Sequence, residues 1–412
     1  MARSLNRKDS HGNVLRKGES QRKDQRYIYQ YTDRFKQRHV VYANNLPDLR
    51  LKEKEILRDQ LEGIEHTVAE KTTVNDLVSR YLELKPFLRD TTRIGYQYMY
   101  RKFVQDGFGK LKISEVRFSD VTSFYLKLIV SDNMAPGTVE NIHNIIHPAF
   151  DLAVRDSLIR NNPSDNAMRD IKKGYGHRKK IRHPLTIEQQ REFFRYINCD
   201  PVFCKWVNLF TVMFGTGMRI SEAAGLCWQD VDFEHEYISV ERQAVELNGK
   251  VGEAGRFTIH DPKTVAGIRK IPMLKEVKRA LEDEYQIQKE LGFNKTVLEG
   301  VTGFVFQNRF GNLISGHMVN DEIHYIVETH NEEEISLAAK EKRELFLLPH
   351  FSCHIIRHTF ATRLCENESN LKAIQSIMGH ANIETTMDIY AEATERKKKD
   401  AIEKIDETDG FF

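Results

Sequence analysis

The sequence has few cysteines and no long run of apolar residues, and both absences narrow what the chain can be. Its cysteines are odd in number and form no CxxC pair, so neither a disulfide framework nor a cysteine-based zinc module is expected. No stretch approaches the roughly 20 apolar residues needed to cross a bilayer. The polar, basic first ten residues lack the apolar region of a secretory signal. We therefore expect a cytoplasmic protein that does not enter a membrane.

Net charge is also nearly absent, at +2 over 412 residues, but the basic residues are clustered. Residues 1–40 carry eleven Lys or Arg against four Asp or Glu, and residues 172–183 carry six Lys or Arg and no acid. Such runs can neutralise DNA phosphates, although each can equally be a solvated tail or linker. The candidate DNA contacts are Arg22, Lys23, Arg26, Lys172, Lys173, Arg178, Lys179, Lys180 and Arg182.

The N-terminal part has the pattern of a small sheet with one helix. Short, alternating aromatic runs at 26–33 and 38–44 predict two antiparallel strands. The stretch at 49–64 has the periodicity of an amphipathic helix. We expect an N-terminal domain over residues 1–66.

A helical domain is predicted over residues 70–170. Apolar spacing and a capping pair indicate a helix that begins near residue 73. Further helical patterns cover 119–130 and 136–159, and Pro148 inside the last one should kink it. The predicted fold class is mostly α with small β-sheets, that is, α+β.

A basic linker at 171–183 leads into a larger domain over 184–412. A mostly apolar helix, a double-glycine turn and a second helix occupy 206–226. A small sheet then interrupts the helices, because several runs have strand-like composition. These runs are 236–242, 256–263 and 268–273.

Two basic residues stand at turns in this domain. Arg219 in GTGMRISEAAGL begins a helix after the glycine turn, and its planar guanidinium suits two phosphate oxygens. Lys263 in HDPKTVAGIRK stands where a strand enters a turn, from which a lysine can reach a groove or donate a proton. Taken alone, either residue is better explained as a solvated surface side chain.

The stretch HFSCHIIRHTFATRL combines histidines and an arginine at helical spacing. His354 and Arg357 are three positions apart, so both face one side of a helix, and His358 lies near that face. A pair of histidines four residues apart can bind zinc, but position 355, where the zinc-protease motif has glutamate, is Ile355. With too few ligands as well, no metal site is expected.

The stretch MGHANIETTMDIYAEAT begins at Met378. Gly379 ends one helix, as glycine commonly does, His380 follows, and Tyr390 lies on a second helix. Tyr390 is a candidate nucleophile, although most tyrosines at helical spacing are packing residues. A helix, short turn and helix is also the pattern of a helix-turn-helix reader of the DNA major groove.

Four motifs, taken in order, resemble those of the tyrosine recombinases, the lambda-integrase-like enzymes. They are R-x-S-E with Arg219, H-x-x-R with His354 and Arg357, the pair Gly379-His380, and Tyr390. The likeness extends from the linker to Thr394 and includes the lysine turn. The helical domain is similar to the family's core-binding domain. The basic N-terminal domain is similar to the arm-binding domain of integrases from conjugative transposons of Gram-positive bacteria.

The resemblance implies transesterification of a DNA phosphodiester. The hydroxyl of Tyr390 attacks phosphorus and forms a 3′-phosphotyrosine link with a free 5′-hydroxyl. The link keeps the bond energy, so rejoining needs no ATP. Arg219 and Arg357 are expected to stabilise charge on the non-bridging oxygens, a task that metal ions perform elsewhere. We therefore expect no cofactor.

Proton transfer requires further groups, because a tyrosine is protonated at neutral pH. His354 is the candidate general base. Lys263 is the candidate acid for the leaving 5′-oxygen, and His380 is expected to donate a hydrogen bond to the phosphate. The sequence does not divide the acid and base roles between the two histidines. Glu222, one turn after Arg219, is expected to be a structural hydrogen-bond partner.

The resemblance also implies partners: double-stranded DNA at core and arm sites, a homo-tetramer on that DNA, an excisionase and a host DNA-bending protein. The segment after Tyr390 would dock on a neighbouring subunit through Ala401, Ile402 and Ile405, although a frayed terminus explains it equally well. Two other functions remain open at this point: a DNA-binding regulator without strand cleavage, and a type IB topoisomerase-like relaxing enzyme. The separate basic N-terminal domain favours integration, because a second DNA contact helps to bridge distant sites.

Overall fold

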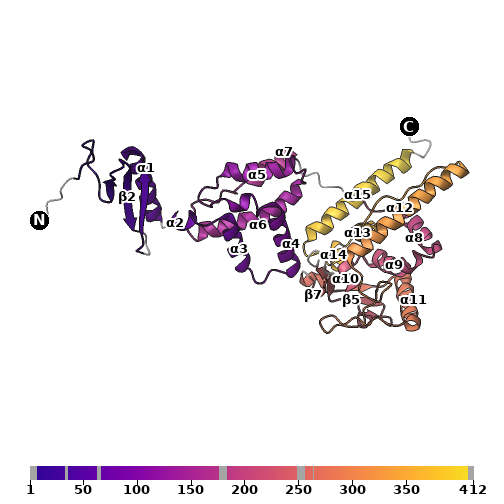
Figure 1. Cartoon of the computed structure of the whole chain (residues 1–412). Coiled ribbons are helices and arrows are strands. Elements are labelled where there is room, and N and C mark those ends of the chain that lie inside the picture. Colours follow the sequence, from indigo (N-terminus) through magenta and orange to yellow (C-terminus); the bar gives the residue numbers. More distant parts are fainter. Residues whose placement is uncertain are drawn as a thin grey trace. The chain divides into compact units, whose positions relative to one another are not determined.

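The computed structural model describes residues 7–32, 36–62, 66–175, 183–247, 256–262 and 264–406. The chain divides into two compact units, Met1–Lys179 and Lys180–Phe412, and each is described by itself. Figure 1 shows their helices and strands. Among the described residues, no helix is long and apolar enough to cross a membrane.

The first unit begins with a three-stranded sheet and one helix (Figure 1). Its elements are β1 (Glu19–Gln21), β2 (Tyr27–Thr32), β3 (Arg38–Ala43) and α1 (Leu46–Glu62). The strands pair antiparallel in the order β1-β2-β3. Tyr27 and Tyr29 are two positions apart on β2, so both point to one face, where they are buried with Leu49 of α1. The predicted strands and helix are confirmed here, with the helix beginning three residues earlier than expected.

Six further helices of the described residues in this unit form a second apolar core. They are α2 (His66–Ala69), α3 (Val74–Glu83), α4 (Asp90–Phe103), α5 (Phe118–Val130), α6 (Pro136–Arg155) and α7 (Ala167–Tyr175). The capping box of Thr73 and Asp76 begins α3 as predicted. Helix α6 continues through Pro148 and ends four residues before the predicted boundary.

Three of these helices were not predicted from the sequence: α2, which is a single turn, α4 and α7. Helix α4 packs Tyr96, Met99, Tyr100 and Phe103 against the core, and this helical spacing was overlooked in the sequence. Helix α7 extends to Tyr175, whereas the sequence had placed the start of the linker at residue 171. Its buried face consists of Ala167, Met168 and Ile171. This apolar stripe is short, and the basic residues that follow it made the stretch resemble a linker.

The second unit combines helices with two small sheets (Figure 1). Its helices are α8 (Ile187–Cys199), α9 (Val207–Thr216), α10 (Ile220–Ala224), α11 (Lys275–Leu291), α12 (Gly316–Glu341), α13 (Cys353–Asn367), α14 (Leu371–Met378) and α15 (Ile383–Asp406). Its strands are β4 (Val231–Asp232), β5 (Tyr237–Val240), β6 (Gln243–Leu247), β7 (Arg256–His260) and β8 (Arg269–Pro272). Strands β4, β5 and β8 form one antiparallel sheet, and β6 pairs with β7.

Two apolar clusters hold this unit together. Phe193 of α8, Phe210 of α9 and Phe304 are fully buried in the larger cluster. A smaller cluster, which includes Ile374 and Met378, joins α13, α14 and α15. The three strand-like runs each contain a strand, as predicted. The sequence missed β4, which is only two residues long, and β6, because neither of its two buried residues, Gln243 and Ala244, is a large apolar side chain.

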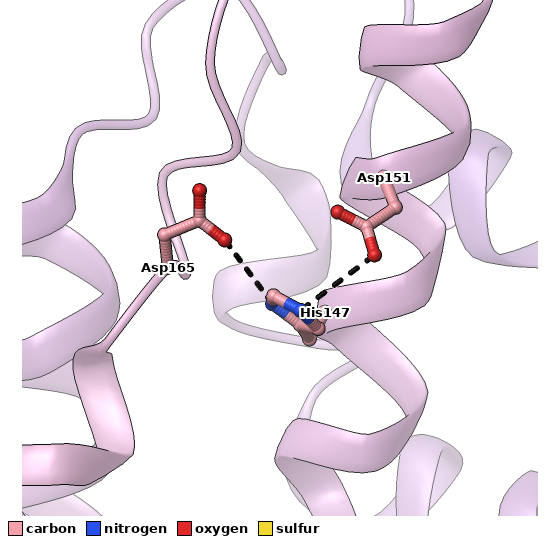
Figure 2. A group of neighbouring side chains, drawn as sticks. All are labelled: His147, Asp151 and Asp165. Carbon is pink, nitrogen blue, oxygen red and sulfur yellow. Dashed lines mark ion pairs between the residues drawn. The ribbon is translucent and has the colours of Figure 1, made fainter.

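A polar group ties the segment after α6 back to that helix (Figure 2). Asn162 is buried, and its Nδ2 donates hydrogen bonds to the carbonyl oxygen of His147 at 3.0 Å and to Asp151 Oδ1 at 2.8 Å. Figure 2 shows His147 between Asp151, 3.6 Å from Nε2, and Asp165, 3.8 Å from Nδ1. One ligand atom from each of these three residues lies within 4.8 Å of the others. Because each carboxylate is nearest a different ring nitrogen, the arrangement suits ion pairs better than a single metal ion.

The first prediction concerns Asn162. Asn162 Oδ1 accepts hydrogen bonds from the backbone N–H and the hydroxyl of fully buried Ser164, so replacement of Asn162 by Ala leaves buried groups unpaired. We expect a destabilisation of about 2 kcal/mol in the helical part of the first unit. Hydrogen exchange in the intact chain should show faster exchange in α6 and in residues 160–165. Asn161→Ala is the matched control, because Asn161 is exposed. Equal protection in the two variants would contradict this account.

Candidate active site

Arg219 lies at the corner between α9 and α10. Helix α9 ends at Gly217, whose φ of 62° is the left-handed conformation that glycine adopts most easily. A Cβ at Gly217 would also collide with the ring of Phe360 on α13. The predicted double-glycine turn is therefore a single-glycine turn, because Gly215 lies within α9.

The guanidinium of Arg219 is held on one side and open on the other. Its Nη1 donates to Glu222 Oε1 at 2.6 Å, and its backbone N–H donates to Glu222 Oε2 at 2.9 Å. The side chain of Glu222 is fully buried, whereas that of Arg219 is 40% exposed. Glu222 therefore has the hydrogen-bonding role expected from the sequence, and it fixes Arg219 while leaving its outer surface accessible.

A second arginine, not singled out from the sequence, binds the same carboxylate. Arg269 on β8 donates from Nη2 to Glu222 Oε2 at 2.9 Å. Burial raises the pKa of Glu222, but Arg269 and Arg219 outweigh this effect and hold that pKa below its usual value. The sequence contained a signal for Arg269, because on β8 it alternates with exposed Lys270 and shares the buried face of Ile271.

Arg357 on α13 is buried without a carboxylate among the hydrogen-bond partners that the described residues give it. Its Nη1 donates to the carbonyl oxygen of Gly217 at 2.8 Å, and its Nη2 donates to that of Met378 at 2.5 Å. Burial, together with the nearby charge of Arg219, lowers the pKa of Arg357 to about 9. The guanidinium is therefore still charged at neutral pH, and an anion beside it would relieve this unfavourable burial.

His380 lies against the same arginines. It follows Gly379, which ends α14 with a φ of 63°. A Cβ at Gly379 would lie 2.9 Å from the carbonyl oxygen of Ala266 and 3.0 Å from Arg269 Cδ, so this approach also requires glycine. Burial and then the charge of Arg357 lower the pKa of His380 to about 4. The imidazole is therefore neutral at physiological pH.

A residue missed in the sequence contacts the ring of His380. The hydroxyl of Thr386, on the first turns of α15, lies 3.0 Å from His380 Nδ1, and Thr386 is fully buried. This hydrogen bond uses one ring nitrogen and leaves Nε2 for another partner. No sequence motif predicts this role for a threonine. The short turn between α14 and α15 places Thr386 beside the ring of His380.

Tyr390 lies on α15, half-buried, and packs against the cluster that contains Ile374 and Met378. Met378 thus contacts this cluster through its side chain and Arg357 through its carbonyl oxygen. An ion pair of 3.6 Å between His358 of α13 and Glu392 of α15 further joins the two helices. The nucleophile candidate and the arginine cluster therefore share one packed framework.

The remaining predicted catalytic residues are less fully defined by the structure. His354 is exposed on the first turn of α13, one turn before the buried Arg357. Lys263 lies outside the described residues. It directly follows Pro262, and the turn at Val265–Gly267 connects this segment to β8. The structure thus brings together Arg219, Arg357 and His380, with Tyr390 on the adjacent helix.

The predicted DNA contacts fall into three groups. Arg22 and Arg26 lie over the ring of Tyr42, at 5.8 Å and 6.0 Å, and Lys23 is exposed between them in the sequence. Lys172 and Lys173 were expected in a linker but lie on the last turn of α7. Lys172 is paired with Glu140 at 2.5 Å, whereas Lys173 is exposed. The four others lie outside the described residues: Arg178, Lys179, Lys180 and Arg182.

Comparison with known proteins decides the family. Residues 184–397 match the model of the phage integrase family. The chain belongs to this family of tyrosine recombinases. Residues 3–60 match a second family model, the DNA-binding domain of Tn916 integrase. The family resemblance noted in the sequence is therefore confirmed, and the protein is a tyrosine site-specific recombinase.

Relatives match this family member over nearly its whole length. The transposase from transposon Tn916 of Enterococcus faecalis is 30% identical over 405 residues, which cover 95% of this chain and 94% of that protein. A structure of the Tn1549 transposon integrase in complex with transposon right end DNA is 30% identical, with a TM-score of 0.68 and coverage of 81% and 99%. A lambda integrase tetramer bound to a Holliday junction, at 15% identity and a TM-score of 0.50 over 89% and 96%, shares the fold. The mostly helical fold expected from the sequence is confirmed.

The second prediction concerns the protonation of His380. Because its pKa falls from 6.5 to about 4 on folding, the unfolded chain binds the proton more tightly between these pH values. The second unit should therefore lose stability as the pH falls through this window. An NMR titration of histidine-labelled protein should show two rings with midpoints near 4, those of His380 and of His143 in the first unit, and only the first should disappear in His380→Asn. A midpoint near 6.5 for the His380 ring would contradict the proximity of the arginines.

Proposed function

We propose that this chain is the integrase of a conjugative transposon, which cuts and rejoins double-stranded DNA at the ends of its element. The observation that carries the proposal is the arginine cluster around Glu222. Arg219, Arg269 and Arg357 surround a single buried carboxylate, so the cluster has an excess of positive charge and a half-exposed guanidinium at its edge. A phosphodiester supplies the missing anion.

Arg219 and Arg357 are proposed to bind the non-bridging oxygens of the scissile phosphate. The two side chains are fixed before the substrate arrives, Arg219 by Glu222 and Arg357 by two carbonyl oxygens. Donors that are fixed in advance do not have to reorganise as charge develops at phosphorus. They therefore lower the activation barrier for cleavage more than mobile donors would. The cluster can therefore perform by itself the electrostatic work of a divalent metal ion.

Tyr390 is proposed as the nucleophile that forms the 3′-phosphotyrosine link. His354, exposed one turn before Arg357, remains the candidate base, and Lys263 remains the candidate acid for the 5′-oxygen. For His380, the hydrogen bond to Thr386 supports a donor role. If the Thr386 hydroxyl donates to Nδ1, the neutral ring carries its proton on Nε2 and can donate it to the phosphate.

The first unit is proposed to bind DNA in two ways. The N-terminal sheet carries Arg22 and Arg26 stacked over Tyr42, a basic and aromatic surface suited to an arm site. The helical part is proposed to bind the core site, with Lys173 and the linker cations at the phosphate backbone. Such contacts add affinity without sequence choice, so base recognition must come from other side chains.

Assembly and regulation are proposed from family membership. The active form is proposed to be a homo-tetramer on DNA in the bacterial cytoplasm, in which the segment after Tyr390 docks on a neighbouring subunit. Direction is proposed to depend on an excisionase and a host DNA-bending protein. Residues 401–406 continue helix α15, which supports a helical docking segment.

The third prediction tests the nucleophile. DNA spanning the element end next to the gene, nicked to trap the intermediate, should form a covalent adduct with wild-type protein on a denaturing gel. Tyr390→Phe should bind the same DNA without forming the adduct. Tyr325→Phe, on α12, is the matched control and should behave as wild type. A chelator should leave the wild-type adduct unchanged.

Two outcomes would contradict this part of the proposal. An adduct with Tyr390→Phe would mean that another residue is the nucleophile. Specific binding by wild type and Tyr390→Phe without any adduct would favour a DNA-binding regulator.

The fourth prediction separates two neighbouring lysines. Lys173→Gln should reduce the slope of log binding constant against log salt by about one, because one phosphate contact is lost. Lys172→Gln should change the slope less, since Glu140 already neutralises its charge. Lys295→Gln, an exposed site in the second unit, is the control for charge alone. A wild-type slope for Lys173→Gln would remove this residue from the interface.

A further inference from the structure

We propose that Arg269 is a positioning residue for strand cleavage, which holds Arg219 in place and leaves its positive charge available to the phosphate by sharing the carboxylate of Glu222. The inference rests on the proposed function, in which Arg219 binds the scissile phosphate. Arg269 belongs to none of the four motifs that mark the family in this sequence. It acts through other residues, because its own side chain is only 3% exposed and has no open face for a substrate.

Arg269 uses its guanidinium to join three separate segments. Nη2 donates to Glu222 of α10 at 2.9 Å, and Nε donates to the carbonyl oxygen of Ile377 at 2.7 Å. Nη1 donates to the carbonyl oxygen of Gly267 at 3.1 Å, in the turn that follows Lys263. The planar guanidinium of arginine can donate hydrogen bonds in three directions at once, which the single ammonium of lysine does not do in this geometry.

The three segments are those that carry catalytic candidates. Helix α10 begins after Arg219, the end of α14 leads into Gly379 and His380, and the Gly267 turn leads back to Lys263. Gly379 lies so close to Arg269 that any side chain there would have its Cβ 3.0 Å from Arg269 Cδ. Arg269 thus determines the spacing between the parts of the site from inside the protein.

Charge provides the second part of the argument. Glu222 Oε1 binds Arg219, whereas Oε2 is shared between the Arg219 backbone and Arg269. With Arg269 in place, the negative charge of Glu222 is balanced by a buried partner, and Arg219 keeps most of its attraction for a phosphate. Without Arg269, the carboxylate would be compensated by Arg219 alone, and the net charge presented to the phosphate would fall by one.

The decisive experiment compares two scissile groups. Cleavage is measured on nicked DNA with either an ordinary phosphodiester or a methylphosphonate at the scissile position, at saturating protein. A methylphosphonate replaces one charged oxygen with a methyl group, so its cleavage depends less on cationic side chains. Tyr390 attacks phosphorus and expels the 5′-oxygen in both cases.

For Arg269→Gln we expect cleavage of the phosphodiester to fall by about a hundredfold, because Arg219 is displaced and its charge is neutralised by Glu222, and the loss of one oriented donor costs about that much. On the methylphosphonate the loss should be at least tenfold smaller. Arg269→Lys should recover part of the phosphodiester activity through its charge, but not all of it. The same fold-loss on both substrates, or wild-type cleavage by Arg269→Gln, would overturn the proposal.

A matched control distinguishes positioning from general destabilisation. Arg242→Gln removes another arginine of the second unit, whose side chain is 13% exposed and pairs with buried Asp230 outside the arginine cluster. Any loss in Arg242→Gln should be equal on the two substrates. If Arg242→Gln shows the same substrate-dependent loss as Arg269→Gln, the effect is not specific to the Glu222 network and the proposal is wrong.

A double-mutant cycle gives an independent readout if Arg269→Gln folds poorly at the working temperature. On the Glu222→Gln background the carboxylate charge is already gone, so Arg269→Lys should cost less activity than it does on the wild-type background. Equal costs on both backgrounds would overturn the shared-carboxylate mechanism. Failure of wild-type protein to form an adduct on either substrate would instead contradict the proposed function itself.

Discussion

The second unit depends on one buried carboxylate among three arginines. Glu222 alone would be costly to bury, and Arg219, Arg269 and Arg357 alone would repel one another. Together they hold α10, β8 and the end of α14 in contact, and they leave an excess of positive charge. The same imbalance that makes the cluster unfavourable in isolation makes it suitable for a phosphate, so stability and activity make opposing demands here.

The ends of two helices supply the hydrogen-bond acceptors of Arg357. Arg357 donates to carbonyl oxygens at the C-terminal ends of α9 and α14, where the unpaired carbonyl groups of a helix favour a cation. Both helices end at a glycine in the left-handed conformation, Gly217 and Gly379. Glycine is needed at both positions for two reasons: the backbone has a positive φ, and a neighbouring residue leaves no space for a Cβ. Both helices therefore end beside the site.

The sequence revealed those parts of the site that depend on residue type and spacing. Arg219, Arg357, His380 and Tyr390 were recognisable because their motifs occur in order, and the structure brings the first three together. Arg269 was missed because its importance comes from contacts with segments distant in the sequence. Thr386 was missed because it belongs to no motif and reaches His380 through the short turn between α14 and α15. The helical position of Lys172 and Lys173 was missed for a local reason, because few large apolar residues mark α7. Helix α4 was overlooked although its apolar residues have helical spacing.

The residues that form the arginine cluster are far apart in the sequence, and this has a consequence for the protein during its synthesis. Arg357 bonds to a carbonyl group 140 residues earlier, and Arg269 bonds to one 108 residues later. A ribosome has therefore made almost all of the second unit before these contacts can form, and Tyr390 emerges after every arginine of the cluster. Incomplete chains that still lack α15 contain the arginines without Tyr390, so under the proposed mechanism they cannot cleave DNA.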